Sequence, residues 1–144
     1  MAQKADNKEN KMLIEHFMPR FCETDALGHI NNVSYSAWVE QSRTSLLMNR
    51  DEIAFREGFN FVLANVNMDF MAEGYFGQQV SNHSWISELG RSSLCIRTDV
   101  FQDNRQLLNA RSTLVYFDLT QKKTCPMPDD FRALIEQSSA FRPE

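Results

Sequence analysis

Residues 33–49 read VSYSAWVEQSRTSLLMN, and this stretch decides the fold. Mostly apolar side chains recur along it every three or four residues: Tyr35, Trp38, Val39, Ser42 and Leu46. Because an α-helix turns once in about 3.6 residues, this spacing predicts a helix from Val33 to Asn49 with one broad apolar face. The aromatic residues on that face indicate that the helix is buried.

A strand is expected before this helix. Between Met12 and Cys22 the alternating residues Met12, Ile14, His16 and Met18 predict a strand whose buried face carries these four side chains. The following residues, 23–32, do not continue the alternation and predict a loop.

The pattern changes after the helix. Residues 51–57 predict a short second helix that Gly58 stops. A period of two then predicts a strand with one covered face, formed by Val62, Ala64, Val66, Met68 and Phe70.

The rest of the chain predicts three more strands and a last helix. The strands are expected over Val80–Leu89, Ser93–Gln102 and Leu107–Asp118, with turns at residues 88–92 and 102–105. Pro126 and Pro128 then interrupt the chain, and Asp129 is expected to cap a short helix. One side of that helix is apolar and carries Phe131, Leu134 and Ile135.

This order of elements points to an α+β domain in which an antiparallel five-stranded sheet wraps around one long central helix. Residues 1–11 (MAQKADNKENK) are charged and predict a flexible tail, so we expect one domain over residues 12–144. A single helix leaves an edge strand and part of a face uncovered. Pairing with a second copy of the chain would protect both.

Charge and composition exclude several classes of protein. The 144 residues include 15 Lys+Arg and 19 Asp+Glu, a net charge of −4, which argues against a nucleic-acid binder. No apolar run reaches the roughly 18 residues of a membrane span. Cys22, Cys95 and Cys125 form no C-x-x-C pair and indicate neither a disulfide framework nor a zinc site. We therefore expect a cytoplasmic protein without a metal.

The loop before the helix carries the candidate chemistry. Residues 23–32 read ETDALGHINN, in which Gly28 and two asparagines predict a loop that ends in a helix cap. Backbone N–H groups of the first helical turn lack partners, so this end of the helix can stabilise an oxyanion. If Asp25 points to the same place, the site has what acyl transfer needs at minimum. The alternative is that Asp25 is a turn residue, as many loop aspartates are.

A family resemblance rests on this segment. TDALGHINNVSYSAWVEQSR, residues 24–43, resembles the signature of the hot-dog-fold acyl-CoA thioesterases related to 4-hydroxybenzoyl-CoA thioesterase, T-D-x-x-G-H-V-N-N-x-x-Y followed by E-x-x-R. The matching positions are Thr24, Asp25, Gly28, His29, Asn31, Asn32, Tyr35, Glu40 and Arg43. Later landmarks, GRSS at residues 90–93 and the ending with its P-x-P before a last helix, are also similar.

The resemblance implies a hot-dog domain that forms homodimers or homotetramers and hydrolyses an acyl-CoA thioester without metal or other cofactor. It implies that Asp25 is the nucleophile or the general base, and that the backbone amide of Asn32 polarises the thioester carbonyl. The chain departs from some members, which have a Tyr and a His where it has Phe21 and Asn32. It also lacks a Pro within residues 71–79 that commonly ends a strand there.

Other residues have two readings each. His29 could assist Asp25 or could bond the backbone of its tight loop. Glu40 could reach the pocket of a partner or bond neighbouring loops. His16 and His83 fall in strand patterns and are expected to be ordinary sheet residues, while Tyr35 and Trp38 are expected in the core or the pocket wall.

The phosphates of CoA need cations and hydrogen-bond donors. Candidates lie in loops and near helix ends: Arg91, Ser92, Ser93, Lys122, Lys123 and Arg132. Each cation has the alternative reading of a solvated surface charge.

Two other functions stay open at this point. One is a hot-dog hydratase or dehydratase of enoyl thioesters, because Asp25 and His29 could form its acid–base pair. The other is a non-catalytic acyl-CoA-binding module. The acyl group, and the choice between CoA and acyl-carrier-protein thioesters, cannot be derived from these residues.

Overall fold

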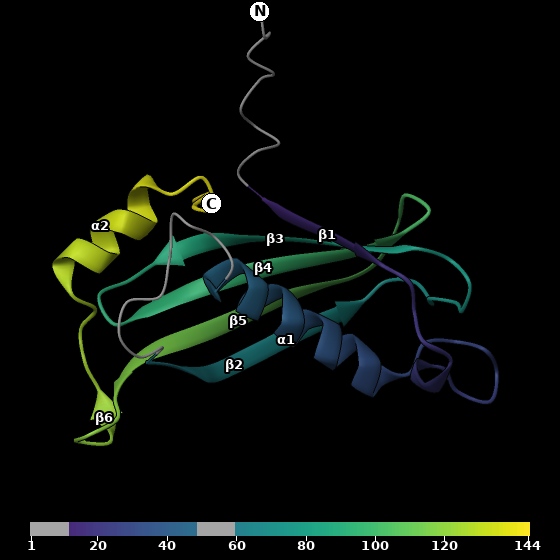
Figure 1. Ribbon diagram of the computed structural model, residues 1–144, viewed down its shortest axis with the longest axis horizontal. Helices are drawn as coiled ribbons and strands as arrows, with labels where there is room; N and C mark the ends of the chain where they lie inside the picture. The colour runs from purple at the N-terminus through teal and green to yellow at the C-terminus, as the bar shows by residue number, and fades with distance from the viewer. Residues whose placement is uncertain (1–11, 49–59) are drawn as a thin grey trace, which may run out of the picture.

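The predicted long helix is α1 (Asn32–Met48), which lies across one face of an antiparallel sheet in the computed structural model (Figure 1). The structure describes residues 12–48 and 60–144. The helix begins one residue before the predicted start. The predicted short helix over residues 51–57 and the predicted tail over residues 1–11 lie outside the described residues.

The sheet has five long strands in the spatial order β1-β3-β4-β5-β2, and each pairing is antiparallel. The strands are β1 (Leu13–Phe17), β2 (Phe61–Phe70), β3 (Val80–Leu89), β4 (Ser93–Gln102) and β5 (Arg105–Asp118). A short β6 (Lys123–Thr124) pairs with the end of β5. The four strands predicted after the long helix and both turns are thus confirmed, with an earlier start for β5.

The prediction for the first strand is wrong in its length and in its buried face. β1 ends at Phe17 because Pro19 has no N–H for the ladder. Phe17 is paired with the buried Val80, and residues opposite each other share a face, so Phe17 points to the helix. Its ring lies 5.1 Å from that of Trp38. The predicted inward residue Ile14 is instead exposed.

The covered face predicted for β2 is also largely wrong. Val66 and Met68 are half-buried, whereas Val62, Ala64 and Phe70 are exposed. α1 packs on β1, β3 and β4, so little of it reaches the edge strand β2. A bulge between Leu63 and Asn65 also shifts the register with β5. The alternation of apolar and polar residues in β2 therefore does not correspond to a face that the same chain buries.

Two apolar clusters fill the space between α1 and the sheet. One surrounds the first half of α1, and its members are Ile30, Tyr35, Trp38, Val39, Val80, Val100, Leu107, Leu108 and Ala110. The other packs Leu46 and Leu47 against Ile135 of α2 (Asp129–Gln137). Polar contacts lie between the clusters, among them a 2.9 Å hydrogen bond between the hydroxyls of Ser42 and Thr98. The first cluster fixes the end of α1 that the candidate loop precedes.

The last helix starts where expected but is capped differently. Asp129 is the first residue of α2, Pro128 is the N-cap residue with φ −55° and ψ 140°, and no side chain caps the helix. The prediction that Asp129 is the cap is therefore wrong. Neither α-helix in the described part of the chain has the length and apolar character of a membrane span.

Candidate functional site

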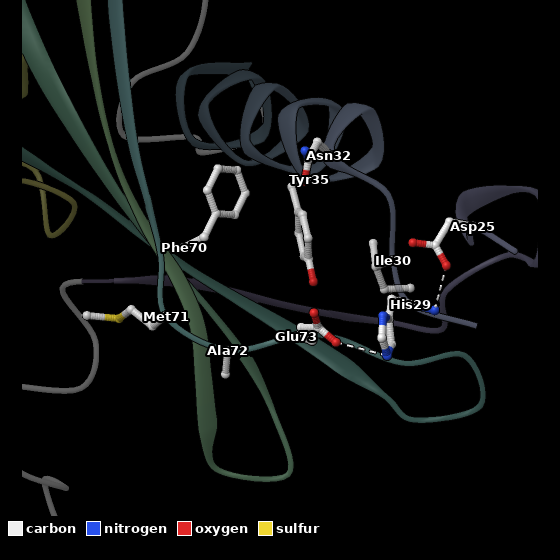
Figure 2. A pocket seen from close by; sticks show the side chains of 9 residues that line it. All are labelled: Asp25, His29, Ile30, Asn32, Tyr35, Phe70, Met71, Ala72 and Glu73. Carbon is white, nitrogen blue, oxygen red and sulfur yellow. Dashed lines mark hydrogen bonds and ion pairs between the residues drawn. The ribbon is translucent and has the colours of Figure 1, made fainter. Parts of the chain in front are cut away.

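A pocket of about 340 Å³ opens where the loop before α1 meets the chain that follows β2 (Figure 2). Its walls combine polar and apolar groups: Asp25, His29, Ile30, Asn32, Tyr35, Phe70, Met71, Ala72 and Glu73. Both residues of the predicted chemistry, Asp25 and Asn32, line it. The pocket therefore joins two segments that are far apart in the sequence.

Asp25 shapes its own loop and also lines the pocket. Its Oδ1 accepts hydrogen bonds from the backbone N–H groups of Leu27 at 2.8 Å and His29 at 3.1 Å. Gly28 completes the turn with a φ of 81°, a left-handed conformation that suits glycine. Within the described residues, Oδ2 of Asp25 has no hydrogen-bond partner. The predicted turn role thus uses one carboxylate oxygen and leaves the other available.

The start of α1 offers free backbone amides. Oδ1 of Asn31 accepts a hydrogen bond of 2.8 Å from the N–H of Ser34, which confirms the predicted asparagine cap. The N–H groups of Asn32 and Val33 have no acceptor among the described residues. Because the positive end of the helix dipole lies here, the N–H of Asn32 can stabilise negative charge in the pocket.

The imidazole of His29 pairs with a residue that the sequence did not single out. Its Nε2 lies 2.9 Å from Oε2 of Glu73, in the segment after β2 (Figure 2). The His29 side chain is 26% exposed and that of Glu73 62%. Only the backbone of His29 contacts Asp25. Among the described residues the imidazole therefore makes neither the contact with Asp25 nor the hydrogen bond to the loop backbone that the sequence suggested. No sequence pattern could have indicated Glu73, because its role depends on a long-range contact.

Tyr35 forms the inner wall of the pocket, as predicted. Its hydroxyl accepts a hydrogen bond of 2.8 Å from the backbone N–H of Gly74. Burial raises the pKa of the Tyr35 hydroxyl against the opposing effect of this hydrogen bond, and the nearby Glu73 raises it further. Tyr35 therefore stays neutral and fixes the chain after β2 to α1.

Trp38 is held by a buried carboxylate at the foot of the loop. Its Nε1–H donates a 2.7 Å hydrogen bond to Oε2 of Glu23. Oε1 of Glu23 accepts another, also of 2.7 Å, from the backbone N–H of Arg20. These bonds tie the start of the loop to the first half of α1. Trp38 is a core residue, as expected.

A family model described as the thioesterase-like superfamily matches residues 19–135. The chain belongs to this superfamily. It is similar to the long-chain acyl-CoA thioesterase FadM of Escherichia coli (strain K12), with 25% identity over 117 residues, 78% of this chain and 89% of the relative. The region matched by the family model, residues 19–135, includes the pocket loop, α1 and every strand of the sheet except β1.

Solved structures support the same assignment. A predicted thioesterase from Bacillus stearothermophilus superposes with a TM-score of 0.81 at 26% identity, covering 92% of this chain and 98% of that one. 4-Hydroxybenzoyl-CoA thioesterase from Pseudomonas sp. strain CBS-3 shares the fold, with a TM-score of 0.74 at 13% identity over 86% and 99% of the two chains. The chain is therefore a thioester hydrolase with the hot-dog fold that the signature implied.

Glu40 of this thioesterase lies outside the Asp25 pocket. It lines a second hollow, of about 370 Å³, between α1 and β2. Oε2 of Glu40 is 3.6 Å from Nη2 of Arg43, whose side chain is only 10% exposed. Burial lowers the pKa of the Arg43 guanidinium, and Glu40 opposes this effect. Within one chain, Glu40 therefore acts on the helix and not on the candidate loop.

The residues predicted to bind CoA lie at the opposite end of the sheet from the pocket. The turn between β3 and β4 contains Arg91 and Ser92, and Ser93 is the first residue of β4. Lys122 lies in the turn between β5 and β6, and Lys123 is the first residue of β6. Arg132 donates a hydrogen bond of 2.9 Å to the carbonyl of Gly90, so it supports this turn. A single chain does not bring these residues to Asp25.

The remaining histidines and Phe21 lie outside the pocket wall. His16 and His83 are sheet residues, as expected, and burial lowers the pKa of His83. Phe21, which replaces a Tyr of some relatives, is exposed, and its ring lies 5.9 Å from that of Phe76. Phe76 and Glu73 both belong to residues 71–79, the segment that lacks the proline commonly found there in the similar family.

Proposed function

We propose that this thioesterase hydrolyses an acyl-CoA thioester to the free acid and CoA. The observation that carries the proposal is that Asp25, which has a free carboxylate oxygen, and Asn32, which has a free backbone N–H, line one pocket. The similarity to an enzyme named as a long-chain acyl-CoA thioesterase supports CoA as the carrier. An acyl-carrier-protein thioester is the alternative substrate.

In the proposed mechanism the thioester carbonyl oxygen accepts a hydrogen bond from the N–H of Asn32. The helix dipole and this donor stabilise the oxyanion that forms during attack. Asp25 either attacks the carbonyl carbon with Oδ2 or removes a proton from the attacking water. The turn bonds to Oδ1 hold the carboxylate in position for either role.

We also propose that the active unit is a homodimer, or a homotetramer built from such dimers. β2 is at the edge of the sheet, and Val62, Leu63 and Phe70 on it are exposed, which favours pairing with β2 of a second copy. In antiparallel pairing, the Phe61 end of one β2 meets the Phe70 end of the other.

The proposed dimer would bring the predicted CoA-binding residues of one copy close to the Asp25 pocket of the other. Tyr116 of β5 pairs with Phe61, so the turns that carry Arg91 and Lys122 lie at the Phe61 end of the sheet. In the proposed dimer, these turns of the second copy approach the first copy's Asp25 pocket. Arg91, Lys122 and Lys123 would then bind the phosphates of CoA, with Ser92 and Ser93 near its pantetheine arm. The cytoplasmic location stays a prediction from cysteine usage.

The test is release of free thiol from a panel of aliphatic and aromatic acyl-CoAs by the wild-type chain and Asp25→Asn. Asparagine keeps an Oδ1 for the N–H groups of Leu27 and His29, so the turn and the melting temperature should be preserved. We expect kcat to fall by a factor of about a hundred or more. Unchanged turnover would exclude the role of Asp25.

Mass spectrometry of the same reactions separates the alternatives. The proposed function predicts free CoA and a carboxylic acid. A hydratase would add one water to an enoyl-CoA without releasing CoA, and a binding module would leave the mixture unchanged. Either of the last two results contradicts the proposal.

A further inference from the structure

Glu73 is the second carboxylate of the pocket and reaches it from a different segment than Asp25. Its Oε2 contacts Nε2 of His29 at 2.9 Å. The other ring nitrogen, Nδ1, makes no hydrogen bond within the part of the chain that the structure describes. The imidazole therefore has one nitrogen fixed by a carboxylate and one available to a bound substrate (Figure 2).

The backbone around Glu73 is held firmly. The carbonyl of Glu73 accepts a hydrogen bond of 2.8 Å from Nη1 of Arg105, and the carbonyl of Gly74 accepts one of 2.9 Å from the N–H of Ile30. The ring of His29 also packs edge-on against Tyr75, with 5.2 Å between ring centroids. The position of the imidazole is thus defined from two sides.

We propose that His29 is the catalytic proton donor to the departing thiolate and that Glu73 is the positioning residue that orients its imidazole. This inference rests on the proposed thioester hydrolysis. It assigns opposite tasks to the two carboxylates: Asp25 acts where the new C–O bond forms, and Glu73 acts through His29 where the C–S bond breaks.

The protons balance in this scheme. Water, deprotonated by Asp25, or Asp25 itself adds to the carbonyl carbon, and the oxyanion at Asn32 then collapses with cleavage of the C–S bond. If Asp25 adds, its side chain becomes an acyl anhydride, and water then breaks the bond between the acyl carbon and Oδ2, which releases the acid and restores the carboxylate. The bonding electron pair goes to sulfur, and the imidazolium of His29 transfers its Nδ1 proton to the sulfur, giving the free thiol and a neutral imidazole that keeps its Nε2 proton on Glu73. His29 regains a proton from the water that is consumed, after that proton has passed through Asp25 or solvent. The sum is one thioester and one water converted to one acid and one thiol.

A purely structural role for the pair makes a different prediction. If Glu73 and His29 only joined the loop to the segment after β2, their loss would slow all substrates alike. Proton donation matters only for a leaving group that is strongly basic. The dependence of rate on the leaving group therefore separates the two roles.

The experiment compares two esters of one acyl group, the CoA thioester and a thiophenyl ester, whose aryl thiolate leaves without a proton. For the CoA ester we expect kcat to fall about a hundredfold in His29→Gln and about tenfold in Glu73→Gln. For the thiophenyl ester we expect both variants to stay within about threefold of wild type, because no acid is needed there. Glu73→Asp should regain part of the loss.

Glu88→Gln is the matched control. It removes one exposed carboxylate from β3, which pairs with Nη2 of Arg111 at 2.6 Å and lines neither the pocket nor the proposed β2 interface. Its kinetics on both esters should equal those of wild type, and its melting temperature provides the reference for Glu73→Gln.

The outcomes are distinct. Equal losses on both esters, or no loss on either, would overturn the inference while leaving the proposed function in place. A wild-type chain that releases no thiol from any acyl-CoA would overturn the proposed function itself. A selective loss on the CoA ester would support both.

Discussion

The hydroxyl of Tyr35 accepts a hydrogen bond from the backbone N–H of Gly74, 2.8 Å away and 39 positions along the chain. Tyr35 belongs to α1 and Gly74 to the segment after β2, so this bond sets the distance between the two main walls of the pocket. Glu73 precedes Gly74, and its contact with His29 depends on that distance.

Gly74→Ala should damage this junction. A Cβ at position 74 would lie 2.8 Å from the Tyr35 oxygen, 3.0 Å from Cδ1 of Leu107 and 3.1 Å from Cγ1 of Ile30. Overpacking of this kind costs about 1–3 kcal/mol, so we expect a lower melting temperature and lower thioesterase activity. Removing the hydroxyl by adding Tyr35→Phe should recover part of the stability. A double variant less stable than Gly74→Ala would contradict this account.

Asp25→Ala should differ from Asp25→Asn in stability. Alanine removes the acceptor of the N–H groups of Leu27 and His29, at a cost of about 1 kcal/mol, whereas asparagine retains it. Asp118 accepts the N–H groups of Thr120 and Gln121 at 2.8 and 3.0 Å in a similar turn. Asp118→Ala should therefore lose comparable stability in urea unfolding but keep kcat. Equal stability of the two Asp25 variants would show that the turn bonds contribute nothing measurable.

Gln102→Leu should loosen the segment that carries Glu73. The buried Gln102 side chain accepts a 2.9 Å hydrogen bond from the N–H of Tyr75 and donates to the carbonyls of Tyr75 and Gln78 at 2.7 and 3.1 Å. Leucine leaves these groups without partners, so we expect a loss of about 3 kcal/mol or more. Amide hydrogen exchange at Tyr75 should accelerate. Gln121→Leu, at an exposed position, is the control, and an unchanged exchange rate at Tyr75 would refute the anchoring role of Gln102.

Asp99→Asn should alter the pH dependence of stability. Burial raises the pKa of the Asp99 carboxyl, against the opposing effects of Arg97, His83 and Gln106, while Glu144 raises it further. Between the ordinary value of 3.8 and the raised value, the folded state binds more protons than the unfolded one. Stability is therefore lost as pH rises through this window.

Asp99→Asn has no carboxyl to ionise at this position, so it does not lose stability as the pH rises through this window. Its free energy of unfolding should exceed that of wild type at neutral pH, and the difference should shrink toward about pH 3, where both states of wild type are protonated. Urea titrations at several pH values measure it. A variant that is less stable than wild type at neutral pH would show that the contacts with Arg97 and His83 outweigh burial.

The sequence by itself determined the elements whose causes are local. The helical spacing of Tyr35, Trp38 and Val39 predicted α1, and the turn residues separated the strands of the sheet. The loop chemistry was also local: a carboxylate that bonds nearby N–H groups and free amides at a helix start both follow from a few consecutive residues. For this reason Asp25 and the start of the helix could be singled out from the residues, whereas their catalytic roles, and the choice of the Asn32 amide, came from the family resemblance.

Tertiary structure alone decided which faces are covered and which distant residues meet. Alternation in β1 was real, but its register with β3 turned Phe17 inward and left Ile14 exposed. Glu73 reaches His29 only because β2 ends beside the start of α1. The physical reason is that periodicity records a side chain's spacing, whereas burial and contact depend on the neighbour that packing supplies.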